Sequence, residues 1–194
     1  FDPELNEIIP LFLSSKTKWQ IKKMKEATDD TIIIFIDEPY LVAVGSNEFA
    51  ALDRASISSK INTVVEAIHR EGAIAGIHCC GNTDWSICFE TDIDILSFDA
   101  FEFMDSLFIY RDSVGAFVKR GGVLACGIVP NREDCNLDTY REVAIDALKK
   151  ECVLLENGAL ITSSCGCGSV SEEFAITANR LTVAIAQELE LVDK

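Results

Sequence analysis

The chain has 194 residues, of which 48% are hydrophobic and 25% are charged, and this composition predicts one or at most two globular domains and excludes a disordered chain. It carries 17 basic and 32 acidic residues, a net charge of −15, so its surface repels nucleic-acid backbones and anionic lipid. No apolar run approaches the ~20 residues that span a bilayer, and no signal peptide is visible.

Short β-rich runs alternate with longer amphipathic runs along the chain. The predicted strands are residues 31–36, 73–77, 93–98, 123–129 and 159–162. The predicted helices are residues 18–27, 57–71, 85–90, 110–120, 137–157 and 171–191. This alternation predicts an α/β fold with parallel strands and crossover helices, either a doubly wound sheet or a (β/α)8 barrel. No Gly-x-Gly-x-x-Gly follows the first strand, which argues against dinucleotide binding.

Residues with reactive or metal-binding side chains follow each predicted strand. In chain order these residues are Asp37 and Glu38, His78 and Cys80, Asp99, Asn131, and finally Cys165 and Cys167. The carboxyl ends of parallel strands open on one side of the fold, where active sites lie. We therefore expect these residues to converge.

The clearest metal-binding pattern is His78-x-Cys80, because alternate residues of an extended segment point to the same face. Cys165 would add a second thiolate, and sulfur with imidazole in tetrahedral geometry selects zinc. Asp99 is a candidate fourth ligand or a hydrogen-bond partner of His78, and Glu102 competes for either role. An open fourth position indicates catalysis, whereas closure by Cys79 or Cys167 would indicate a structural site.

Asp37 and Glu38 are the candidate catalytic acids or bases, and either could hold a substrate ammonium group. Asn131 and Trp85 are candidates for contacting the substrate, although a tryptophan more often serves in packing. The eight cysteines include adjacent and nearly adjacent pairs, so we expect reduced thiols in a cytoplasmic protein rather than a disulfide framework.

Five segments together resemble cobalamin-independent methionine synthase and the wider superfamily that includes uroporphyrinogen decarboxylase and the methylcobamide:coenzyme M methyltransferases. They are FIDEP (35–39), IHCCGN (77–82), ILSFDAF (95–101), GGVLACGIVP (121–130) and SSCGCGSVSEE (163–173). The resemblance implies the C-terminal part of a (β/α)8 TIM barrel, with zinc held by His78, Cys80 and Cys165. It aligns Asp99 with a glutamate ligand and Asp37 with the aspartate that contacts the amino group of the acceptor.

The expected function is therefore zinc-dependent methyl transfer to a small thiol similar to homocysteine or coenzyme M. The donor would be a methylfolate or a methylcorrinoid, the latter on a corrinoid protein. The alternatives are a non-catalytic zinc-binding or corrinoid-partner subunit and a metal-free decarboxylase-like enzyme. A full barrel takes about 250 residues, so we expect residues 1–194 to form a single domain, a fragment of a longer chain that a second copy or a partner chain completes.

Overall fold

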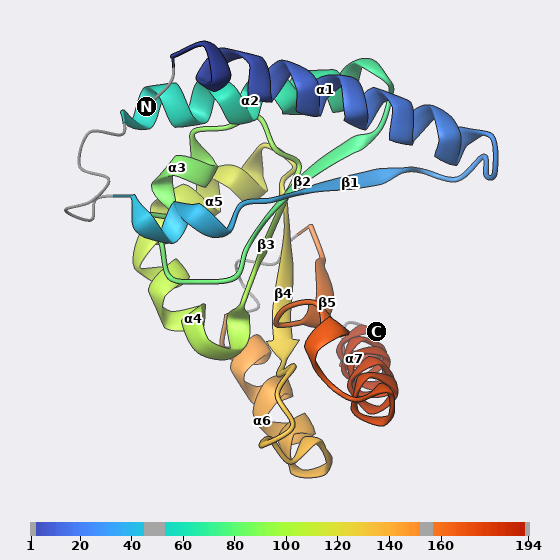
Figure 1. Ribbon diagram of the computed structural model, residues 1–194. Helices are drawn as coiled ribbons and strands as arrows, with labels where there is room; N and C mark the ends of the chain where they lie inside the picture. Colours follow the sequence, from blue (N-terminus) through green and yellow to red (C-terminus); the bar gives the residue numbers. More distant parts are fainter. Residues whose placement is uncertain (1–2, 45–52, 152–156, 193–194) are drawn as a thin grey trace. The chain divides into compact units, whose positions relative to one another are not determined.

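The computed structural model describes residues 3–44, 53–151 and 157–192 and shows an α/β fold (Figure 1). Its described residues form one five-stranded sheet with the strands in chain order. The strands are β1 (Ile33–Asp37), β2 (Ile74–Cys79), β3 (Ile95–Phe98), β4 (Val123–Val129) and β5 (Ala159–Ser163). Every predicted strand is confirmed, with boundaries shifted by two residues or fewer.

The longest helices are α1, α2, α6 and α7. The helices are α1 (Pro3–Lys25), α2 (Arg54–Arg70), α3 (Ser86–Phe89), α4 (Ala100–Leu107), α5 (Arg111–Lys119), α6 (Leu137–Lys150) and α7 (Glu172–Val192), with the short 3₁₀ turns η1 (Pro39–Ala43), η3 (Phe108–Tyr110) and η5 (Cys167–Ser169). The prediction of a helix over 18–27 was wrong about its start, and α4 was not predicted. Residues 152–156 of the predicted helix 137–157 lie outside the described residues.

Residue contacts divide the chain into two compact units. The first comprises Phe1–His78 and Thr83–Leu96, and the second comprises Cys79–Asn82 and Ser97–Lys194. In the described residues of both units, no helix is long and apolar enough to cross a membrane.

In the first unit, α1 lies along α2 (Figure 1). The residues of α1 that face α2 are mostly small: Pro10, Ser14 and Thr17 are buried together with Ile21. The hydroxyl of Ser14 donates to the carbonyl of Thr63 on α2 at 3.2 Å. Strands β1 and β2 pair in parallel, with Asp37 opposite His78 at their carboxyl ends.

In the second unit, β4 and β5 pair in parallel, and α7 packs against β5 and α6. The pairing is irregular between Gly127 and Val129. Gly127 itself lies in a crowded position, where a Cβ atom would lie 2.7 Å from the carbonyl oxygen of Phe98 and 2.8 Å from the Cα of Ser164. Only glycine allows the chain segment that precedes Cys165 to approach β4 this closely.

Replacing Gly127 with alanine should therefore destabilise the protein by about 1–3 kcal/mol, the usual cost of overpacking a tightly packed position. Urea unfolding measures this change as a lower midpoint. The matched control is Gly115→Ala in α5, where a Cβ would meet no atom within 4 Å, and which should stabilise the helix by about 0.5–1 kcal/mol. Equal midpoints for the two variants would contradict the steric argument.

Candidate metal centre

Three of the predicted ligands come together at the carboxyl ends of the strands. His78, Cys80 and Cys165 each offer one ligand atom, and these atoms lie within 4.8 Å of one another. His78 and Cys165 are partly buried, and Cys80 is exposed. One imidazole and two sulfurs are thus placed so that the group could hold a single metal ion.

The end of β2 positions His78 and Cys80. Alternate residues of the strand point to the same face, so the intervening Cys79 is directed elsewhere, and it is fully buried. The backbone N–H of Glu38 donates to the carbonyl of His78 at 3.0 Å, which continues the pairing of β1 with β2 beyond the strand itself. The imidazole therefore comes from a rigid, hydrogen-bonded strand end.

Hydrogen bonds from the β4–α6 loop and from β5 hold the loop that carries Cys165. The hydroxyl of Ser163 donates to the carbonyl of Cys165 at 2.8 Å. The Asn131 side chain donates through Nδ2 to the carbonyl of Gly166 at 3.1 Å and accepts through Oδ1 from the hydroxyl of Ser164 at 3.0 Å. The sequence predicts that Asn131 contacts substrate. In the structure, both ends of its side-chain amide form hydrogen bonds with the residues on either side of Cys165, namely Ser164 and Gly166.

The local electrostatics favour the uncharged forms of Cys80 and His78. Although Cys80 is exposed, partial desolvation of its thiol raises the pKa of Cys80 above its ordinary value, and the interactions with Cys165 and Asp99 raise it further. Burial lowers the pKa of His78, and the nearby Asp37 carboxylate only partly opposes this effect. A cation placed among the three would stabilise the thiolate form of Cys80. The donor set of two sulfurs and a neutral imidazole fits a soft or borderline metal ion.

Asp99 does not belong to the group of three. It is the N-cap of α4, where its carboxylate accepts from the backbone N–H of Glu102 at 3.0 Å. Burial raises the pKa of this carboxyl, and the Glu102 N–H acts in the opposite direction. The rival candidate Glu102 forms an ion pair with Arg132 at 2.9 Å. Both acids therefore interact with residues outside the group of three ligands. Asp99 affects the pKa of Cys80 through its charge.

The other predicted residues have different environments. Asp37 ends β1 with its side chain exposed, directly opposite His78. The Glu38 carboxylate accepts from the backbone N–H of Tyr40 at 3.2 Å and caps η1. Trp85 is completely buried, which places its indole in the core of the first unit rather than on a surface that a substrate could reach.

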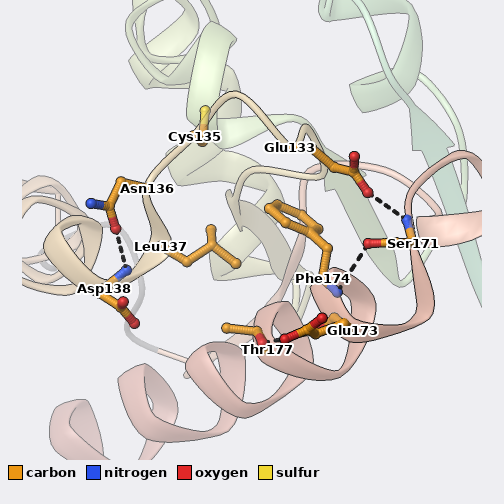
Figure 2. A pocket seen from close by; sticks show the side chains of 9 residues that line it. All are labelled: Glu133, Cys135, Asn136, Leu137, Asp138, Ser171, Glu173, Phe174 and Thr177. Carbon is orange, nitrogen blue, oxygen red and sulfur yellow. Dashed lines mark hydrogen bonds between the residues drawn. The ribbon is translucent and has the colours of Figure 1, made fainter.

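A separate pocket of about 310 Å³ lies in the second unit, between the start of α6 and the start of α7 (Figure 2). The carboxylate of Glu133 accepts from the backbone N–H of Ser171 across this pocket at 2.7 Å. Asp138 and Glu173 add negative charge, and Phe174 adds an apolar surface. None of the three grouped ligands lines the pocket, so it is distinct from the metal-binding group.

The hydrogen bonds of Ser163 and Ser164 near Cys165 were not predicted from the sequence. The sequence Ser163-Ser164-Cys165 does contain a signal, because serine hydroxyls before a turn commonly bond to nearby backbone groups. A comparison of the chain with models of known families and with curated proteins gives no match.

Proposed function

We propose that the chain is a zinc-dependent methyltransferase that activates a thiol acceptor. The observation that carries this proposal is the convergence of His78, Cys80 and Cys165 to within 4.8 Å. The order and spacing of the motifs, which resemble the superfamily of cobalamin-independent methionine synthase, support the same activity.

Zinc is the metal that this donor set favours. Cysteine sulfur and histidine nitrogen are its usual protein ligands, and a site with three protein ligands keeps a fourth position for a substrate. Carboxylate and carbonyl oxygens, which magnesium and calcium require, are absent from the group. When bound there, zinc would lower the pKa of an acceptor thiol and keep that thiol nucleophilic at neutral pH.

The residues of the chain have two tasks in this proposal. His78, Cys80 and Cys165 hold the ion, and the Asn131 hydrogen bonds to Ser164 and Gly166 keep the Cys165 loop in place. Asp37 has an exposed carboxylate opposite His78, and it is suited to hold the ammonium group of an amino-acid thiol. Methyl transfer forms a carbon–sulfur bond on the acceptor and breaks the bond to the donor, which keeps the electron pair.

We further propose that the sheet is the C-terminal part of a (β/α)8 barrel. The strand order β1-β2-β3-β4-β5 follows the chain without reversal. Doubly wound sheets reverse their strand order at a switch point, whereas a barrel adds each strand beside the previous one. The sequential order and the ligands at the strand ends both support the barrel.

The test is a methylation assay with the zinc-loaded chain. Methylcobalamin or methyltetrahydrofolate is incubated with homocysteine or coenzyme M, and the thioether product is measured by mass spectrometry. We expect zinc-dependent methylation with at least one pair, lost in Cys165→Ser and kept in Cys167→Ser. A zinc-loaded chain that is inactive with every pair would favour a non-catalytic zinc-binding subunit instead.

A further inference from the structure

Helix α1 exposes a stripe of large apolar side chains to solvent. Leu5, Ile8, Phe12 and Trp19 are 55%, 54%, 64% and 61% exposed. Their spacing of three, four and seven residues places them along one side of the helix. At about 100° per residue, this side is opposite the buried seam of Pro10, Ser14, Thr17 and Ile21. The stripe therefore faces away from α2, and soluble monomers rarely expose a contiguous apolar surface of this kind.

The charges of α1 are separated along its length. Glu4 and Glu7 lie in its first half, and all five of its lysines lie in its second half. On the helix, Glu4 and Lys22 flank the same edge of the apolar stripe. The first half of this helix is therefore acidic and its second half is basic.

From the stripe and the charge separation, we propose that α1 is a self-association surface on which a second copy of the chain packs antiparallel. A two-fold axis near Phe12 places the two Phe12 rings together and each Leu5 against the partner's Trp19. In a two-fold interface every contact occurs twice, so each Glu4 meets the lysine-rich half of the other helix. A parallel arrangement would instead bring the two Glu4 residues to the same level and the two lysine-rich halves side by side.

The exposed area is of the size that a specific dimer needs. The stripe, together with the neighbouring Ile9 and Leu11, which are 53% and 59% exposed, presents on the order of 700 Å² per chain. A standard interface buries about 800 Å² per partner. Aromatic residues at the centre of such a surface, here Phe12 and Trp19, usually contribute most of the binding energy.

Sedimentation equilibrium of the full chain at several concentrations tests the proposal. We expect a mass of twice the 21.3 kDa chain and a dissociation constant at least ~10-fold higher in Phe12→Gln. The matched control is Met24→Gln, which removes another exposed apolar side chain of α1 at 43% exposure outside the stripe and should leave association unchanged. Circular dichroism confirms that each variant is folded.

A charge exchange tests the antiparallel orientation. Glu4→Lys and Lys22→Glu should each weaken the dimer, and the double variant should restore it, although both changes oppose the helix dipole. A monomer at every concentration would overturn the proposal, as would a dimer insensitive to Phe12→Gln or a double variant no tighter than the single ones. Sedimentation of a monomeric chain with phosphatidylserine–phosphatidylcholine vesicles would assign the stripe to lipid instead.

Discussion

Cys80→Ser and Cys165→Ser should each abolish stoichiometric binding of zinc, the largest effect that we expect of any single substitution. A serine hydroxyl stays protonated at neutral pH and is a poor zinc ligand, whereas zinc is bound by thiolate sulfur. Four-ligand zinc sites have apparent binding free energies of ~10–16 kcal/mol. Loss of one ligand should therefore weaken binding by roughly two to three orders of magnitude.

The chain provides matched controls for this measurement. Cys167 lies two residues beyond Cys165 and Cys135 lies in the β4–α6 loop, and neither belongs to the grouped ligands. Cys167→Ser and Cys135→Ser should keep one zinc per chain after dialysis against a weak chelator, as measured by elemental analysis. Cobalt substitution adds a second measurement, because cobalt–thiolate absorption should decrease in Cys80→Ser and Cys165→Ser alone. Full metal content in both of these variants would exclude the site.

The metal-binding group could be predicted because its positions follow from simple rules. The strand over 73–77 is an uninterrupted apolar run, and alternation along a strand places His78 and Cys80 on one face. The carboxyl ends of parallel strands meet at one edge, which brings Cys165 to them from a position far away in the sequence. These rules need only the strand positions, and the strands carry the strongest signal in this sequence.

The start of helix α1 was missed, because the prediction placed it at residue 18 rather than at Pro3, and the outward orientation of its apolar side could not be predicted. Periodicity analysis assumes that the apolar stripe marks the buried face, but the buried seam here is mainly Pro10, Ser14 and Thr17. Helix α4 did have a sequence signal: Asp99 followed three residues later by Glu102 is similar to a capping box. Asp99 was predicted to be a metal ligand or a hydrogen-bond partner of His78, and its role as the N-cap of α4 was missed.

Other features depend on tertiary contacts that sequence patterns do not encode. Tryptophan is a residue type that can contact a substrate, and only the fold shows that the side chain of Trp85 is inaccessible. The Asn131 bonds to Ser164 and Gly166 require the conformations of two loops that are distant in sequence. The sequence therefore indicates which residues can bind a metal, while the structure shows what holds them in place.

The affinity for zinc should increase with pH through the neutral range. Burial and the nearby charges of Cys165 and Asp99 raise the pKa of the Cys80 thiol, so the metal-free protein keeps this proton at neutral pH and zinc binding must release it. Release of one proton raises the affinity about tenfold for each pH unit below that pKa. Because burial lowers the pKa of His78, its imidazole is already neutral at pH 7 and adds little to this dependence there.

Competition titrations with a chelator of known proton affinity, at pH 6, 7 and 8, measure this dependence. We expect the logarithm of the zinc affinity to rise by at least about one for each pH unit in the native chain. In Cys80→Ser, the slope of the weakened residual affinity should fall by about one, because that variant has lost the thiol whose proton is released. Cys167→Ser should keep the native slope. An affinity that does not change with pH would mean that the metal displaces no proton from Cys80, and Cys80 would then not be a thiolate ligand.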